Sequence, residues 1–169
     1  MSGQPGLSGA PEDGSSAGHA AGQQDMALLV ESAAVRFLSV REHSTRELRD
    51  KLNSRFSDTG LVEQVLAELQ QRNLLSDERF AEQYVSLRTR KGYGPLRIRA
   101  ELAERGIDSA MIDNWLDSSP RAWAEHLREV ARQRFGDAAA GDHREQARRA
   151  RFLQYRGFPE SLIRSYLWD

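Results

Sequence analysis

The sequence predicts an all-α protein of tandem three-helix repeats, with three modules and about nine helices forming an elongated, curved body. Three observations support this prediction. The chain has 20 Ala and 19 Leu against 14 Val, Ile and Thr combined, a balance that favours helices over sheets. Capping residues and glycine stops follow one another closely from Met26 onward. The pattern of apolar residues also repeats with a period of roughly 50 residues.

The first 25 residues have a different composition from the rest of the chain. They contain six Gly, four Ser, four Ala and two Pro, and almost no bulky apolar side chain. Such a segment buries too little apolar surface to offset the entropy lost on ordering. We therefore expect residues 1–25 to form a disordered tail.

The first module is expected over residues 26–75. Its first helix runs from Met26 to His43, and a capping box at Ser44–Glu47 opens the second. Asp58 caps the third helix, which ends near Asn73. The residues expected to share the inner face of the first helix are Leu29, Ala33, Phe37 and Val40.

The second and third modules are expected over residues 76–119 and 120–169. The residues that start or cap their helices are Ser76, Pro95, Asp108 or Ser109, Pro120, Asp142 and Pro159. The residues that end them are Gly92, Gly106, Ser118, Gly136 and Gly157.

The three modules repeat one another in sequence. A shift of 50 residues places Leu48, Leu52, Val62 and Leu66 on Ile98, Leu102, Ile112 and Leu116, and a further shift of 51 places Leu102, Ile112 and Leu116 on Leu153, Ile163 and Leu167. An Arg-Gly pair recurs at 105–106 and 156–157. Chance similarity between amphipathic helices is the alternative, but the turn residues coincide as well as the apolar ones.

The net charge of -1 conceals an asymmetry along the chain. Residues 1–85 carry 8 basic and 13 acidic groups, whereas residues 86–169 carry 16 basic and 12 acidic groups. Arg supplies 22 of the 24 basic residues. A GC-rich genome would explain this, and so would a surface that binds phosphates through guanidinium groups.

No signature of catalysis stands out. The chain has no cysteine, no phosphate-binding loop and no dinucleotide-binding fingerprint, and its four histidines do not follow a metal-ligand spacing. There is also no apolar run near the roughly 20 residues that span a bilayer, and no signal-peptide core. We expect a soluble cytoplasmic protein, not an enzyme, without cofactor or metal.

The strongest candidate for binding is a basic run over residues 88–99, which no acidic residue interrupts. It covers the end of one predicted helix, a Gly-Tyr-Gly turn and the start of the next. Its basic and aromatic residues are Arg88, Arg90, Lys91, Tyr93, Arg97 and Arg99. Such a cluster suits a nucleic-acid backbone, with Tyr93 available to stack on a base. Alternatively, Arg90 and Lys91 complement a helix dipole while Tyr93 packs in the turn.

A second basic cluster lies in the predicted helix after Asp142. Arg144, Arg148, Arg151 and Tyr155 follow i, i+4, i+7, i+11 spacing and therefore share one face. A merely solvated face explains them as well as a binding face does. We include the three arginines among the candidate nucleic-acid or filament-binding residues.

Several of these motifs closely resemble the RecX family, bacterial regulators of the RecA recombinase. The central motifs are the stretch from Ser76 to Val85, the segment from Arg90 to Pro95, and the pairs Ile98-Arg99, Glu101-Leu102 and Gly106-Ile107. The stretch from Arg41 to Leu48, together with Lys51-Leu52, is similar to the family's first repeat. The resemblance covers residues 33–169. One departure is Arg55-Phe56, where the family usually has a Lys/Arg-Gly helix stop.

The resemblance implies tandem helical repeats that lie along the groove of a RecA–DNA filament. It implies that the protein binds RecA and, directly or through the filament, single-stranded DNA. It also implies suppression of RecA's ATP hydrolysis, strand exchange and coprotease activity, in DNA repair, recombination and the SOS response. We expect a monomer that does not engage membranes.

Two other functions fit the same residues. A helix-turn-helix transcription factor would also be helical and basic, although it usually dimerises, and no dimerisation heptad is evident here. A helical-repeat scaffold that binds only protein is the other alternative. Salt-sensitive binding to single strands would argue against the scaffold, and equal affinity for random duplexes would argue against the transcription factor.

Overall fold

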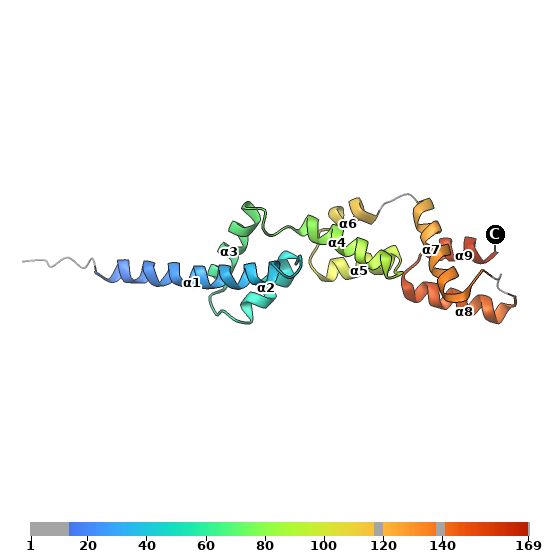
Figure 1. The fold of residues 1–169 in the computed structure, drawn as a ribbon, viewed down its shortest axis with the longest axis horizontal. Coiled ribbons are helices and arrows are strands. Elements are labelled where there is room, and N and C mark those ends of the chain that lie inside the picture. Colours follow the sequence, from blue (N-terminus) through green and yellow to red (C-terminus); the bar gives the residue numbers. More distant parts are fainter. Residues whose placement is uncertain (1–13, 117–119, 138–140, 169) are drawn as a thin grey trace, which may run out of the picture.

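The computed structural model describes residues 14–116, 120–137 and 141–168. Within these ranges the chain forms nine helices and no strand, which confirms the predicted fold class. Their bounds are α1 (Gly14–Leu38), α2 (Thr45–Asn53), α3 (Thr59–Gln71), α4 (Asp77–Arg90), α5 (Pro95–Glu104), α6 (Ser109–Leu116), α7 (Pro120–Phe135), α8 (His143–Arg156) and α9 (Glu160–Trp168). They form three groups of three in an elongated row that follows the chain (Figure 1).

Short-range sequence signals fix where most of the helices begin and end. The N-cap side chain accepts a hydrogen bond from the backbone N–H three residues later at Ser44, Asp58, Ser76 and Asp142, as predicted. The residues with positive φ that follow helix ends are Asn73, Gly92, Gly106, Gly136 and Gly157. These are five of the predicted helix ends, and the one at Ser118 lies outside the described residues.

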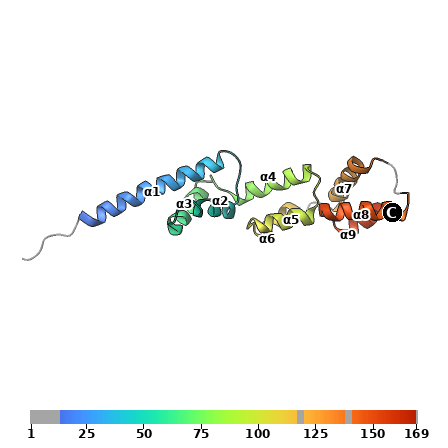
Figure 2. The same cartoon turned by 90° about the horizontal axis from the view of Figure 1, so that it is seen from below.

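Helix α1 begins earlier than the sequence predicts. It starts at Gly14, inside the segment expected to be disordered, and its first half projects from the body (Figure 2). Ala and Gln are good helix formers, and five of them between residues 17 and 24 extend the following helix without a break. Residues 1–13, like the predicted end of the sixth helix at 117–118, lie outside the described residues.

The inner face of α1 is also displaced from the predicted one. Val30 and Ala34 are fully buried against α2 and α3, whereas Leu29 is 58% exposed and Val40 82% exposed. Ala33 and Phe37 of the predicted face are partly buried and pack against the same core. The predicted face is therefore confirmed for these two residues and wrong for Leu29 and Val40.

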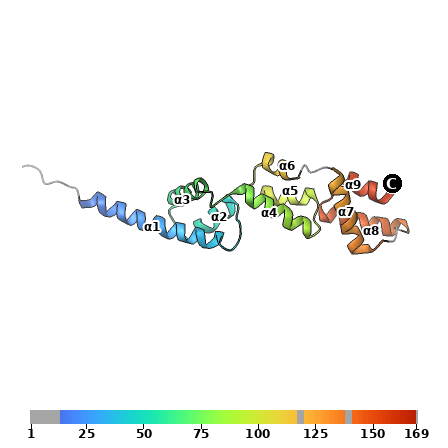
Figure 3. The same ribbon diagram turned by 45° about the horizontal axis from the view of Figure 1, so that its top comes forward.

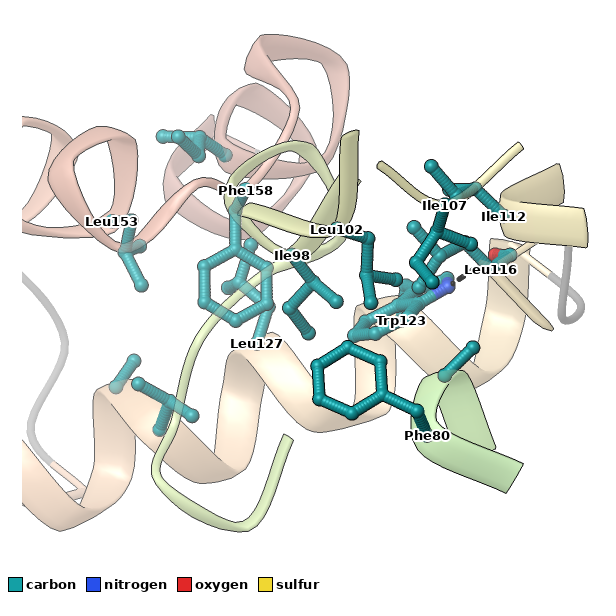
Figure 4. Close-up of a cluster of buried hydrophobic side chains, with 14 residues drawn as sticks. Phe80, Ile98, Leu102, Ile107, Ile112, Leu116, Trp123, Leu127, Leu153 and Phe158 are labelled. Atoms are coloured by element: carbon teal, nitrogen blue, oxygen red, sulfur yellow. Dashed lines mark hydrogen bonds between the residues drawn. The ribbon is translucent and has the colours of Figure 1, made fainter. Parts of the chain in front are cut away.

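Two separate apolar cores stabilise the row of modules. The first module has its own core, which includes Leu48, Val62 and Leu66. The second and third modules share a single core, in which Phe158 of α8–α9 lies next to Ile98 of α5 (Figure 4). The buried indole N–H of Trp123 donates to the carbonyl of Leu116 at 2.9 Å and links α7 to the end of α6. Modules two and three therefore form one packing unit.

Adjacent modules meet end to end along the row (Figure 3). The same kind of hydrogen bond connects both pairs of modules. At the first joint, the buried Ser44 hydroxyl donates to the carbonyl of Arg105 at 2.8 Å. At the second joint, the Gly94 N–H donates to the carbonyl of Arg156, also at 2.8 Å. Ser44 and Gly94 occupy the same repeat position. The recurring Arg-Gly pair thus docks on the start of the preceding module's middle helix.

The first joint is otherwise polar. Arg79 of α4 pairs with Glu42 at 2.8 Å, and Asp77 accepts a hydrogen bond from the Thr45 N–H at 2.7 Å. No side chain of the first module belongs to the core that the other two share. Module one is therefore attached mainly by hydrogen bonds and ion pairs.

Candidate nucleic-acid interface

The basic run covers the end of α4, the turn 91–94 and the first turns of α5. Lys91 ends α4, Gly92 has φ +78°, and Pro95 starts α5 after the Gly94 cap. The resulting corner packs against the joint between α8 and α9, since the Leu96 N–H donates to the carbonyl of Gly157 at 3.0 Å. The run therefore lies where modules two and three meet.

Glu101 organises three side chains at this corner. Its carboxylate accepts two hydrogen bonds from Arg88, one of them 2.6 Å from Nε, and one of 3.1 Å from Arg97 Nε. The Tyr84 hydroxyl donates to it at 2.9 Å. Arg88 and Glu101 side chains are only 17% and 16% exposed, so much of their charge is neutralised internally. The sequence places Glu101 only in the motif that resembles the RecX family and assigns it no role at this corner.

The titration behaviour of this cluster follows from burial and hydrogen bonding. Burial alone would raise the pKa of Glu101, but hydrogen bonds from Arg88, Tyr84 and Arg97 outweigh it and lower that pKa. Burial and the bond to Glu101 together raise the pKa of Tyr84 to about 12. Near neutral pH, Glu101 is thus ionised and Tyr84 remains a hydrogen-bond donor.

Tyr93 is surrounded by cations and packed on the protein. The guanidinium carbons of Arg88, Arg97 and Arg156 lie 3.9, 4.6 and 5.1 Å from its ring centroid. The half-buried ring also packs against the shared core. This environment matches the alternative in which Tyr93 packs in the turn, and it leaves little room for a stacked base.

Arg97 joins the two clusters that the sequence shows as separate. Its guanidinium carbon lies 5.0 Å from the ring centroid of Tyr155, and its Nη1 donates to the Tyr155 carbonyl at 3.2 Å. Arg156 makes a parallel connection, donating to the carbonyl of Lys91 at 2.8 Å. The exposed face of α8 is therefore continuous with the corner.

The basic face of α8 is defined by Arg144, Arg148, Arg151 and Tyr155. All four side chains are exposed, as their shared spacing predicts. Arg148 pairs with Glu145 at 2.9 Å, while Arg144 and Arg151 pair with no carboxylate of the described residues. Arg149, next in sequence to Arg148, is instead buried and pairs with Glu145 at 3.0 Å.

Two residues of the basic run are exposed to solvent, and a third faces α6 instead of the corner. Arg90 and Lys91 are exposed at the end of α4. Arg99 pairs with Asp113 of α6, because two residues along a helix turn its side chain about 200° from that of Arg97. Arg99 therefore points away from Arg97 and the other basic residues of the corner.

A cleft beside this surface also contains arginines, but carboxylates lie next to them. It lies between modules one and two and is lined by Arg41, Arg90 and Arg105 together with carboxylates. Glu47 pairs with Arg41 at 3.0 Å and with Arg105 at 3.2 Å. Since its arginines are partly neutralised, the cleft suits phosphates less well than the exposed face of α8.

The described residues contain no group of three His, Asp or Glu side chains placed to hold a metal ion. In the same part of the chain, no helix is long and apolar enough to cross a membrane.

Family models match each of the three modules. The models describe the first, second and third three-helix domains of RecX and match residues 32–69, 76–116 and 124–167. Their order and placement follow the three groups of helices.

Relatives named "Regulatory protein RecX" match over most of their length. The protein of Halorhodospira halophila is 43% identical over 80% of this chain and 84% of its own. That of Pseudomonas savastanoi pv. phaseolicola is 41% identical over 82% and 90%, and that of Serratia proteamaculans is 38% identical over 82% and 95%.

Solved structures show the same fold. RecX from Lactobacillus salivarius superposes with a TM-score of 0.73 at 22% identity, covering 84% of this chain and 94% of its own. A second crystal structure of regulatory protein RecX gives a TM-score of 0.77 at 23% identity, covering 95% and 80%. With three matched domains in order and relatives above 40% identity, the chain belongs to the RecX family of regulatory proteins.

Proposed function

We propose that the chain is a negative regulator of the RecA recombinase. It binds RecA–single-stranded DNA filaments and inhibits their ATP hydrolysis, strand exchange and coprotease activity. Membership of the RecX family carries this proposal, since its relatives are named as regulatory proteins and the family resemblance implies RecA as the partner. The protein acts in the cytoplasm as a monomer, without a cofactor, in DNA repair, recombination and the SOS response.

The distribution of charge supports a particular orientation on the filament. Residues 86–169 carry 16 basic and 12 acidic groups, and they include the corner and the basic face of α8. Residues 1–85 carry 8 basic and 13 acidic groups. In our proposal, modules two and three approach the DNA and module one faces RecA.

The side chains in this proposal have two different roles. Exposed cations contact phosphates, and these are Arg90, Lys91, Arg144, Arg148 and Arg151, with the partly exposed Arg97 between the corner and α8. Arg88 and Tyr93 support Arg97 from below, because Glu101 and the core hold them. Arg99 is paired with Asp113 and takes no part.

The direct test is RecA's single-strand-dependent ATP hydrolysis during titration of this protein. Strong inhibition at substoichiometric ratios would support the proposal and point to control at filament ends. No effect on the cognate RecA, even with this protein in excess, would overturn it. Binding of single strands without any effect on RecA would leave only a DNA-binding module.

A further inference from the structure

The most exposed aromatic ring beside the basic surface is that of Tyr155. Its residue is 71% exposed, although it lies in the last turn of α8 between buried Leu153 and the Gly157 cap. An aromatic side chain held in water gains nothing from the core. The position is therefore available to a ligand that can use the ring.

Tyr155 is held in place from one side. The Arg97 guanidinium lies 5.0 Å from its ring centroid and also donates to its backbone carbonyl at 3.2 Å. Arg97 is itself fixed by Glu101 at 3.1 Å. Because this partner comes from another module, the ring stands over the joint between modules two and three with its remaining surface open.

The surroundings of Tyr155 suit a negatively charged strand. Arg151 and Arg148 precede it by one and two turns on the same exposed face. Arg151 makes no ion pair with any residue described in the structure. Single-stranded DNA offers phosphates to such a row and unstacked bases to an adjacent ring, whereas a duplex keeps its bases stacked inside.

Tyr93, which the sequence suggests as the residue that stacks on a base, is less accessible to a base than Tyr155. Three guanidinium groups lie within 5.1 Å of its ring centroid, and its ring packs on the core. A base would have to displace these contacts to stack on it. Tyr155 has one such partner and far more exposed surface.

We propose that Tyr155 stacks on a base of single-stranded DNA while Arg148 and Arg151 contact the neighbouring phosphates. This inference rests on the proposed function, which brings the basic surface to DNA. It adds a contact that requires a base, whereas the contacts of the arginines require only the phosphates of the backbone.

The test compares two oligonucleotides of equal length and charge, one of thymidines and one of abasic sites, by fluorescence anisotropy. Wild-type protein is expected to bind the thymidine strand more tightly. Tyr155→Ala should weaken that binding by roughly 5- to 150-fold, the range for one base–aromatic stack. Its affinities for the two strands should then be equal. Tyr155→Phe should retain the preference, because it keeps the ring.

Arg151→Gln is the matched charge control. It should weaken binding to both strands equally and reduce the slope of log affinity against log salt by about 0.7, the value for one phosphate contact on a single strand. Tyr155→Ala should leave that slope unchanged. Circular dichroism is expected to show native helicity in all variants, because the substituted side chains are exposed.

The outcomes separate this inference from the proposed function. If wild-type protein binds neither strand, the stacking role is overturned, and the RecA ATP-hydrolysis titration decides the proposed function separately. If it prefers the thymidine strand and Tyr155→Ala retains that preference, the stacking role is wrong and the proposed function stands. Equal binding of both strands by the wild type also contradicts stacking, and it leaves a contact made through phosphates alone.

Discussion

Glu101 decides how much cationic charge the corner offers to a ligand, because it binds Arg88 and Arg97 at once. Its neighbour in space, Tyr84, adds a hydrogen bond to the same carboxylate. Removing the charge of Glu101 would leave the mostly buried guanidinium of Arg88 without its anion.

Glu101→Gln is expected to lower the free energy of unfolding by about 1–3 kcal/mol, the usual range for a lost hydrogen bond to a charged group. Glu160→Gln removes an exposed ion pair with Arg164 and should change stability by less than about 0.5 kcal/mol. Urea unfolding at neutral pH measures both. Equal effects of the two substitutions would contradict a structural role for Glu101.

His43 should make the stability of the first module sensitive to mild acid. Its Nδ1 lies 3.0 Å from the Arg41 carbonyl, so it carries the hydrogen, and its Nε2 accepts from Lys51 Nζ at 3.1 Å. Burial lowers the pKa of His43 below its ordinary 6.5. The hydrogen bond to the Arg41 carbonyl is the next largest effect and opposes this, while the cations of Arg41 and Lys51 add to the lowering. The folded state therefore resists the proton that the unfolded chain accepts.

Since the unfolded state binds that proton first, stability should fall as the pH drops below about 6.5. His43→Gln cannot be protonated and should lose less stability between pH 7.5 and pH 5 than the wild type. Urea unfolding at the two pH values measures this loss. Burial also lowers the pKa of His126, but this residue is present in both proteins. Its contribution to the loss of stability therefore cancels in the comparison. The same loss in variant and wild type would exclude His43 as its source.

At the scale of helices, the Arg-Gly pair does more than end a helix. A Cβ atom on Gly157 would lie 2.3 Å from the Cβ of Arg97, and one on Gly106 would lie 2.9 Å from the Cδ of Arg46. Both glycines face the preceding module. The first module has Arg55-Phe56 at this position without a positive φ, and no earlier module packs against that turn in the described chain. This turn of the first module therefore does not require a glycine.

Gly94→Ala tests how closely the second joint must pack. The added Cβ would lie 2.5 Å from the backbone oxygen of Gly157, which cannot move aside as a side chain can. We expect the free energy of unfolding to fall by about 1–3 kcal/mol, as for other overpacked sites. Gly60→Ala in α3 meets only Asp58 at 3.4 Å and should stabilise by up to about 1 kcal/mol. If Gly94→Ala left the free energy of unfolding unchanged, the second joint would have room for a methyl group and the close packing would not be required.

The sequence is sufficient to predict features that depend on residues close together in the chain. Caps such as Ser76 and stops such as Gly157 are short-range signals, and the structure confirms them. Contacts between modules are different, since Ser44 and Arg105 are 61 residues apart and Arg97 and Tyr155 are 58 apart. Which arginine faces an acid and which faces solvent depends on how the modules dock, and no local pattern encodes it.

At the scale of the whole molecule, the chain has two packing units joined by a polar contact. One unit is module one, and the other is modules two and three with their shared core. The polar joint has few apolar contacts to transmit a loss of packing. We expect each unit to respond to its own core substitutions.

Leu66→Ala and Leu102→Ala test this division, one in each core. Each should cost about 2–5 kcal/mol locally, as buried Leu→Ala changes do. In hydrogen exchange, Leu66→Ala should reduce protection in α1–α3 alone, whereas Leu102→Ala should reduce it from α4 to α9. Loss of protection along the entire chain in both variants would mean that the protein is a single cooperative unit.

The measurement that most directly tests the central claim is inhibition of RecA's single-strand-dependent ATP hydrolysis by a charge-reversed interface. The variant replaces Arg90, Lys91, Arg144 and Arg151 with Glu, four exposed cations of the corner and the basic face of α8. A control variant reverses four exposed arginines elsewhere, namely Arg36, Arg128, Arg134 and Arg164. With helicity unchanged in both, our account predicts that the interface variant loses inhibition while the control retains most of it. Full inhibition by the folded interface variant would contradict the account.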